Sequence, residues 1–201
     1  MDTKTYAKHI KDNLDIVTYS SMVTSLGNSL NSRKDRFDKS EIIEKSFELY
    51  SNGKFKHVDD IGRDHRDEEN NIDLEFKFSE NGLFTKVKKL PKKNVTVKLK
   101  NSLGKNKGIT IDNPANFYVI GQQDSIAIIS FADIEPYLID EDDGISAKIP
   151  LDKLTFVFKP NEVSDKIKIN EKLSYKQFKA EAILNYIKGF TSTKEDKKVR
   201  Y

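Results

Sequence analysis

The stretch Asp64-His-Arg-Asp-Glu-Glu-Asn-Asn-Ile-Asp-Leu-Glu-Phe-Lys-Phe78 decides the fold of this chain. Its second half alternates between apolar and charged residues without error, which is the pattern of a half-buried strand. One face of this strand carries Ile72, Leu74, Phe76 and Phe78, and the other carries Asp73, Glu75 and Lys77. The sequence therefore predicts a strand over 72–78 with one core-forming face and one charged face.

The residues before this strand predict a hairpin. Glu68-Glu69-Asn70-Asn71 has the composition of a turn, because Asn tolerates left-handed backbone geometry. A hairpin through this turn pairs Asp67 with Ile72, and the same register sets Asp64 opposite Glu75. Side chains directly opposite each other in an antiparallel pair have Cβ atoms about 5 Å apart. We therefore expect the carboxyl groups of Asp64 and Glu75 to lie close together.

Two carboxylates this close predict a metal site. They repel each other unless a cation lies between them. Mg²⁺ prefers oxygen ligands and often uses one or two carboxylates together with phosphate and water. Lys77 lies two residues along the same face, where it would orient or deprotonate an attacking water or stabilise charge on a phosphate. The alternative interpretation is an ordinary solvated sheet face.

An Asp…Glu-x-Lys pattern across a hairpin, preceded by a helix and followed by more strands, resembles the PD-(D/E)xK nuclease superfamily. That superfamily includes many type II restriction endonucleases and related repair nucleases. Glu75-Phe76-Lys77 matches the Glu-x-Lys half of the motif. No proline precedes any candidate for the first acid, so Asp64 is favoured and Asp67 and Asp60 stay as alternatives.

The resemblance covers roughly residues 40–135 in element order. It implies a restriction-endonuclease-like core and Mg²⁺-dependent hydrolysis of phosphodiester bonds. Asp64, Glu75 and Lys77 would be the catalytic residues, with Asp64 and Glu75 as the Mg²⁺ ligands.

A lysine-rich interval follows the charged strand. No acidic residue occurs between Glu80 and Asp112. Basic surfaces of one sign follow the backbone of a polyanion, whereas solvated surfaces usually mix both signs. We expect the DNA-binding residues in this interval to be Lys86, Lys88, Lys89, Lys98, Lys100, Lys105 and Lys107. Lys98 and Lys100 should share one face of a strand, with the opposite face formed by Val95, Val97 and Leu99.

The rest of the chain predicts an α+β or α/β fold, with a mixed central sheet flanked by helices. Helices are expected over 3–14, 17–30, 39–52 and 175–188, with a short helix over 132–138. Further strands are expected over 117–120, 125–131, 145–149 and 154–158. The expected organisation is an N-terminal helical segment over 1–37, an α/β nuclease-like core over 38–190 and a polar tail over 191–201.

Composition limits the function classes. The 201 residues include no cysteine, which excludes disulfides and thiolate metal sites and fits a reducing compartment. No signal-like or membrane-spanning segment is visible, so we expect a cytoplasmic protein without a membrane partner. The histidines His9, His57 and His65 lack the spacing of a histidine–metal nuclease, and we expect structural roles for them.

These observations predict a Mg²⁺-dependent DNA endonuclease of the type II restriction kind, acting on duplex DNA. Cutting both strands of a duplex usually needs two active sites, so a homodimer is expected, with the helices of residues 1–37 as its interface. The alternatives are a non-catalytic nucleic-acid-binding module and a phage or host-defence accessory protein. In the first alternative the lysines bind nucleic acid and there is no metal site. In the second alternative the charged side chains only interact with solvent.

Overall fold

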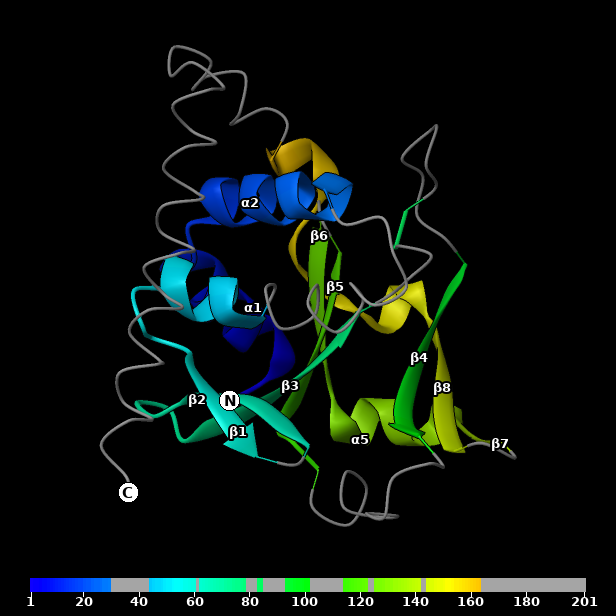
Figure 1. Ribbon diagram of the computed structural model, residues 1–201. Helices are drawn as coiled ribbons and strands as arrows, with labels where there is room; N and C mark the ends of the chain where they lie inside the picture. Colours follow the sequence, from blue (N-terminus) through cyan, green and yellow to red (C-terminus); the bar gives the residue numbers. More distant parts are fainter. Residues whose placement is uncertain are drawn as a thin grey trace, which may run out of the picture.

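The computed structural model of the protein describes residues 1–29, 44–60, 62–78, 83–84, 93–101, 114–122, 125–141 and 144–163. Within these ranges the chain forms two β-sheets, one of six strands and one of three, together with helices (Figure 1). The predicted α+β fold with a mixed central sheet and flanking helices is confirmed.

The large sheet has the strand order β1-β2-β3-β5-β6-β9. Its strands are β1 (Lys56–Asp60), β2 (Arg63–Asp67), β3 (Ile72–Phe78), β5 (Phe117–Gln122), β6 (Ser125–Ser130) and β9 (Thr155–Phe158). β3 and β5 pair in parallel, and every other neighbouring pair is antiparallel. The sheet is mixed because the chain leaves the large sheet after β3 and returns to it beside the same strand.

The small sheet has the order β4-β8-β7, with bounds Asn94–Asn101, Gly144–Pro150 and Leu138–Glu141. It covers one face of the large sheet. Between the two sheets lies a core that we call the sheet-side core, which includes Val95, Val97, Tyr118, Ile120, Ala127, Ile129, Ala147 and Ile149. The alternation predicted for this region is confirmed, since Val95, Val97 and Leu99 are buried and Lys98 is exposed.

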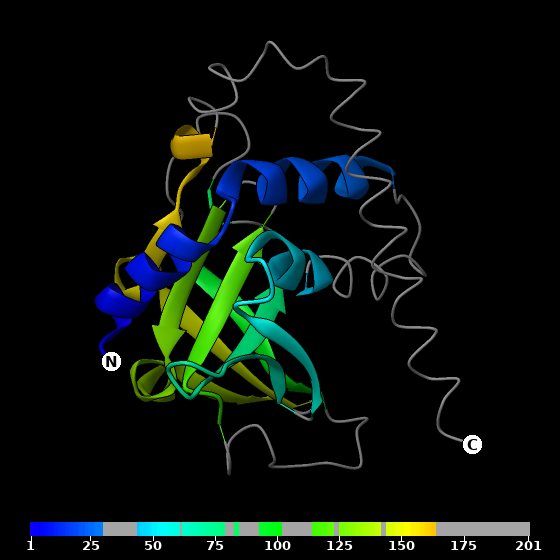
Figure 2. The ribbon, with the colours of Figure 1, turned by 90° about the vertical axis from the view of Figure 1, so that its left-hand side faces the viewer.

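Helices cover the opposite face of the large sheet (Figure 2). They are α1 (Thr3–Asn13), α2 (Ile16–Ser29) and a helical segment over 44–50. Asp2 caps α1 by accepting a hydrogen bond from the backbone N–H of Thr5. The first backbone N–H groups of a helix have no acceptor within the helix, so such a cap stabilises its N-terminus. The helix-side core contains Tyr6, Ile10, Tyr19, Phe47, Leu74, Phe76, Val119 and Ile128.

The β2–β3 hairpin has the predicted register. Asp67 pairs with Ile72 and His65 with Leu74. Asn71 adopts a positive φ of 54° in the turn, which is the geometry that its side chain tolerates. The side chains of Ile72, Leu74 and Phe76 enter the helix-side core, so Asp73, Glu75 and Lys77 point to the face covered by the small sheet.

Some predicted elements differ from the structure. The predicted helix over 132–138 is a short α5 (Phe131–Ile134) followed by the 3-10 turn η1 (Glu135–Tyr137). Pro136 lacks a backbone N–H, which fits the end of regular α-helix there, and β7 begins at Leu138. Residues 39–43 of one predicted helix and all of the helix predicted over 175–188 lie outside the described residues. None of the described helices is long and apolar enough to cross a membrane.

Candidate active site

Glu75 is a buried carboxyl in the middle of β3, with 6% of the residue exposed. Parallel pairing places Tyr118 of β5 beside it. The sheet-side core borders it, because Tyr118 and Ile120 belong to that core. An acid in such a place is costly unless it is paired or holds a cation, so Glu75 needs a partner.

Asp64 supplies a second carboxyl at the same place. Its Oδ2 accepts a 2.5 Å hydrogen bond from the backbone N–H of Phe76, the residue after Glu75. This bond holds the Asp64 side chain against β3. The β2–β3 register, with His65 opposite Leu74, sets the two carboxyls on facing positions, and the Asp64 charge raises the pKa of Glu75.

The surroundings of both carboxyls disfavour their charged forms. Burial raises the pKa of Asp64, and the charge of Glu44 raises it further. Burial also raises the pKa of Glu75, which the Lys77 ammonium lowers and the Asp64 charge raises again. Glu75 Oε2 is buried and has no hydrogen-bond partner within the described part of the chain. Ionising both acids sets two negative charges opposite each other, and the Lys77 ammonium and the Phe76 N–H offset them only in part.

Lys77 lies on the same face of β3 as Glu75. Its ammonium donates a hydrogen bond to Glu75 Oε1. Its side chain is 18% exposed, so this cation is partly removed from water. Lys77 therefore compensates one oxygen of Glu75, whereas Oε2 has no hydrogen-bond partner among the described residues.

Glu44 and His57 were not predicted as part of this site. Glu44 begins the described part of the 44–50 helix, and its carboxylate lies 3.7 Å from His57 Nε2. The nearby Glu44 carboxylate raises the pKa of His57, which burial opposes. Glu44 is also the strongest charge raising the pKa of Asp64. No periodic pattern links residue 44 to residue 64, because the contact between this helix and the sheet is tertiary.

His65 has a structural role, as predicted. Its Nε2 donates a 2.8 Å hydrogen bond to the carbonyl of Glu44, which ties the 44–50 helix to β2. Burial lowers the pKa of His65 to about 3, so the ring is neutral at physiological pH. Phe47 and Phe76 pack against the ring. His65 thus helps to hold Glu44 near Asp64.

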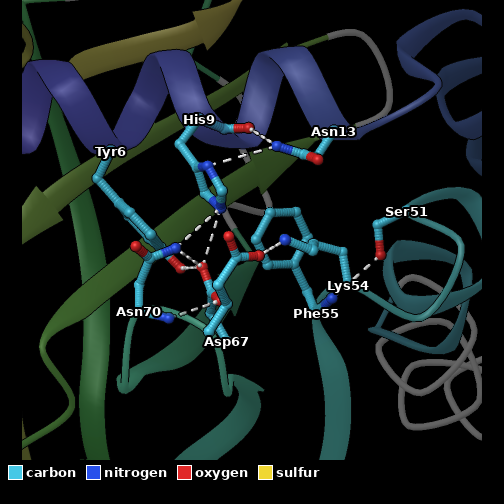
Figure 3. A network of polar contacts seen from close by, with 9 residues as sticks. Tyr6, His9, Asn13, Ser51, Lys54, Phe55, Asp67 and Asn70 are labelled. Carbon is cyan, nitrogen blue, oxygen red and sulfur yellow. Dashed lines mark hydrogen bonds and ion pairs between the residues drawn. The ribbon is translucent and has the colours of Figure 1, made fainter.

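Asp67, one of the alternative acids, belongs to a different network on the opposite face of the sheet (Figure 3). Its buried carboxylate accepts hydrogen bonds from Tyr6 Oη at 3.2 Å, His9 Nε2 at 3.0 Å and the Asn70 side chain at 2.8 Å. The backbone N–H of Asn70 donates to its other oxygen. These bonds fasten α1 to the β2–β3 turn, and they leave Asp67 no part in the Glu75 pair.

Asp60, the other alternative acid, is exposed at the end of β1. Its carboxylate lies 3.8 Å from an Arg63 nitrogen. Arg63 also approaches Asp73, which forms a 2.8 Å ion pair with Arg66. Of the three candidate acids, the structure brings Asp64 to Glu75.

The predicted DNA-binding lysines fall mostly outside the described residues, which include neither Lys86, Lys88, Lys89, Lys105 nor Lys107. The backbone of Lys100 is described within β4, but its side chain is not. Lys98 is exposed on the face of the small sheet that points away from the sheet-side core. The structure therefore does not bring Lys98 into contact with the acid pair, and any shared ligand must be large.

The donor set fits a hard divalent cation. Among the described residues, no group of three or more His, Cys, Asp and Glu side chains is arranged to hold a metal ion. Mg²⁺ in phosphoryl-transfer sites usually takes only one or two carboxylates, with water and phosphate as the other ligands. Asp64 and Glu75 meet that requirement, and Glu75 Oε2 is the buried acceptor that an ion would satisfy.

No protein-family model matches the chain, and no curated protein matches its sequence.

Proposed function

We propose that this chain is a Mg²⁺-dependent endonuclease that hydrolyses phosphodiester bonds in DNA, with Asp64, Glu75 and Lys77 as its catalytic residues. The observation that carries the proposal is the β2–β3 pairing, which sets the half-buried Asp64 carboxyl opposite the buried Glu75 carboxyl, with the pKa values of both raised. A protein gains no stability from such a pair alone, and active sites commonly give up stability in this way. A bound cation would remove the penalty.

Each residue has a distinct task in the proposed reaction. Asp64 and Glu75 present two anionic oxygens from neighbouring strands, and the Phe76 N–H fixes the direction of the Asp64 carboxylate. Mg²⁺ bound there would polarise a phosphate oxygen and lower the pKa of its water. Lys77 lies against Glu75, where its ammonium would orient the attacking water or stabilise charge on the phosphate. Glu44 adds a third negative charge that favours a cation near Asp64.

The proposed reaction also suggests a substrate, an oligomeric state and a cellular location. We propose duplex DNA as the substrate, a type II restriction activity and a homodimer that contacts through the N-terminal helices. The absence of cysteine fits the cytoplasm as its place of action.

A cleavage assay on DNA of high sequence complexity tests the proposal, because a rare target sequence is then still present. Purified protein is incubated with bacterial genomic DNA in Mg²⁺ and in EDTA, and new ends are counted by sequencing. We expect cleavage in Mg²⁺ only. Glu75→Gln should lower the rate about 100-fold or more, as loss of a group that stabilises the transition state does.

The matched control is Glu68→Gln, the same chemical change at an exposed carboxylate of the same hairpin. It should cleave at the wild-type rate. DNA binding without cleavage under any divalent cation would replace the proposal with a non-catalytic binding module. No affinity for DNA would favour a protein–protein accessory role.

A further inference from the structure

Two arginines converge on one carboxylate beside the Asp64–Glu75 pair. Asp73 lies on β3, two residues before Glu75. Its Oδ1 accepts a 2.8 Å hydrogen bond from Nη1 of Arg66, and its Oδ2 lies 3.4 Å from Nη1 of Arg63. Each oxygen of Asp73 thus faces a different guanidinium. We call Arg63 and Arg66 the arginine pair.

Alternation along the two strands places Arg66 on the same face as the acids. In the β2–β3 hairpin (Figure 1), Arg66 is paired with Asp73. Side chains two residues apart on a strand share a face, so Arg66 lies on the face of Asp64 and Glu75. Glu75 is the diagonal neighbour of Arg66, with Cβ atoms about 7 Å apart, a separation that a long side chain can span. A ligand held at the acid pair is therefore within reach of Arg66.

The hairpin fixes the Arg66 guanidinium and leaves part of it open. Nη1 donates to Asp73, and Nη2 donates a hydrogen bond to Oδ1 of Asn71. These bonds occupy only part of a guanidinium, which carries five N–H donors. The Arg66 side chain is 39% exposed, whereas that of Glu75 is 8% exposed. A phosphate would thus meet a pre-organised donor group without the cost of ordering it.

The acids near the arginine pair leave room for a phosphate. Asp73 is half-buried, and its one carboxylate is shared by two guanidiniums. Asp60 lies 3.8 Å from Arg63 with a side chain that is 63% exposed, and surface ion pairs of this kind contribute little. A guanidinium matches a phosphate with two parallel N–H bonds, which adds both energy and geometric specificity. The arginine pair can therefore keep Asp73 and bind an anion as well.

The acid pair creates the need for such a contact. Glu44 adds a further negative charge near Asp64. A DNA backbone whose scissile phosphate lies at the acid pair has neighbouring phosphates, and these carboxylates repel them. A cation on the same face offsets this repulsion. Lys77 contacts Glu75 itself, whereas Arg66 contacts Asp73, two residues along the strand.

We propose that the arginine pair binds a backbone phosphate of DNA, next to the phosphate held at the acid pair. Arg66 contacts this phosphate through its open donors, and Arg63 contacts it from the other oxygen of Asp73. Asp73 holds both guanidiniums in place when DNA is absent. This inference rests on the proposed function, because it takes the acid pair as the place where the scissile phosphate binds.

The test is the salt dependence of DNA binding. Affinity for a labelled duplex is measured by fluorescence anisotropy over a range of salt concentrations, with Ca²⁺ in place of Mg²⁺ to prevent cleavage. Each lost phosphate contact should reduce the slope of log K against log salt by about 0.9. We expect this reduction for Arg63→Gln and for Arg66→Gln, and about twice it for the double variant.

Asp73→Asn separates recognition of phosphate from a structural role. The variant keeps the shape of the side chain and an oxygen that can accept from Arg66, but it removes the charge that competes with phosphate. We expect it to bind the duplex about two- to fivefold more tightly, which matches the strength of one partly exposed ion pair. If the ion pair only stabilised the hairpin, breaking it from either side would change DNA affinity in the same direction.

Arg66→Lys keeps the charge and loses the planar group of donors. Its slope should equal that of the wild type, with a weaker affinity at every salt concentration. Circular dichroism and melting temperature verify that each variant folds. If Arg66→Gln does not fold, Arg66→Lys and Asp73→Asn still decide the question, because their affinities should change in opposite directions.

The controls are Lys4→Gln and Lys8→Gln on α1, which packs against the opposite face of the large sheet (Figure 2). Both lysines are exposed. Lys8 pairs with Asp12, so Lys8→Gln also breaks an ion pair between a cation and a carboxylate. Both slopes should equal that of the wild type.

The outcomes separate this inference from the proposed function. Unchanged slopes in Arg63→Gln and Arg66→Gln, or weaker binding by Asp73→Asn, in a protein that cleaves DNA overturn the phosphate contact and leave the nuclease proposal standing. Reduced slopes in both arginine variants of a protein that never cleaves support the phosphate contact and overturn the nuclease proposal. A wild-type protein that binds no duplex overturns both.

Discussion

The backbone N–H of Phe76 donates a 2.5 Å hydrogen bond to Oδ2 of Asp64. Phe76 lies between Glu75 and Lys77, so the main chain that presents the proposed catalytic residues also fixes the partner acid. The hydrogen bond favours the charged form of Asp64, whereas burial and the charge of Glu44 favour the neutral form. The site thus holds a carboxylate in place without fully compensating its charge.

Replacing Asp64 should stabilise the protein when no divalent ion is present. In Asp64→Asn the amide oxygen can still accept from Phe76, and the side chain no longer places a negative charge opposite Glu75. We expect the free energy of unfolding near pH 8 in EDTA to rise by about 1 kcal/mol, because one repelling charge disappears. Urea unfolding followed by circular dichroism measures it.

The control for this variant is Asp12→Asn on α1, whose carboxylate is 56% exposed. Its free energy of unfolding should change by less than about 0.5 kcal/mol. If Asp64→Asn instead destabilised the protein by a similar or larger amount than the expected gain, Asp64 would be a structural acceptor and the repelling pair would be refuted.

The effect of Mg²⁺ on stability should grow with pH. The folded pKa values of Asp64 and Glu75 are raised, so the folded state keeps protons that the unfolded state has lost. The stability that these acids contribute is complete below their unfolded pKa values and falls as pH rises through the folded ones. Mg²⁺ needs the ionised acids, so its stabilising effect should increase over the same window.

Melting curves from about pH 5 to about pH 8, with Mg²⁺ and with EDTA, measure this effect. His57 titrates in part of this range, because Glu44 raises its pKa. The useful quantity is therefore the Mg²⁺-induced shift in the wild type minus that in Asp64→Asn. A Mg²⁺-induced shift in melting temperature that did not depend on pH, or that was equal in the two proteins, would show that Mg²⁺ does not act through Asp64 and Glu75.

Replacing Asp67 should lower the stability of the protein and leave the Asp64–Glu75 pair unchanged. Asp67→Ala leaves Tyr6, His9 and Asn70 without their shared acceptor. We expect a loss of about 2–3 kcal/mol in the free energy of unfolding, the usual cost of orphaning buried donors. Tyr6→Phe, which removes a single donor, should lose about 1 kcal/mol. A normal stability for Asp67→Ala would show that the network does not fasten α1.

Lys77 should affect chemistry more than DNA binding. Lys77→Met keeps most of the side-chain length but removes the ammonium that contacts Glu75. We expect cleavage to slow by about 100-fold or more, with duplex affinity changed by no more than a few-fold. The pKa of Glu75 should rise further, so Mg²⁺ stabilisation should begin at higher pH. Lys4→Met is the control, and a wild-type rate for Lys77→Met would remove Lys77 from the mechanism.

Much of the hairpin could be predicted from local sequence. The error-free alternation over 72–78 gives β3, and the Asn-rich turn gives the register that pairs Asp67 with Ile72. Both signals are local, because strand period and turn conformation depend on residues close in the chain. The alternation of β4 likewise predicted the inward Val95 and Val97 and the outward Lys98.

Other features depend on contacts between distant residues. The register favoured Asp64, and the missing proline left Asp67 and Asp60 as alternatives. The Tyr6 and His9 side chains of α1, which bind Asp67, are not visible in the local sequence. Glu44 reaches Asp64 only because the 44–50 helix packs on the sheet. β1 has little alternation, with Val58 as the single aliphatic residue of Lys56-His-Val-Asp-Asp60, and it is a strand because β2 pairs with it.

The most direct test of the account is the binding of Mn²⁺, a spectroscopic substitute for Mg²⁺, measured by electron paramagnetic resonance with a short duplex to supply phosphate ligands. We expect the wild type and Asp12→Asn to bind Mn²⁺ equally. Asp64→Asn and Glu75→Gln should each bind it about tenfold or more weakly, a difference of about 1.4 kcal/mol. Equal Mn²⁺ affinity in all four proteins would contradict a metal site between these two strands.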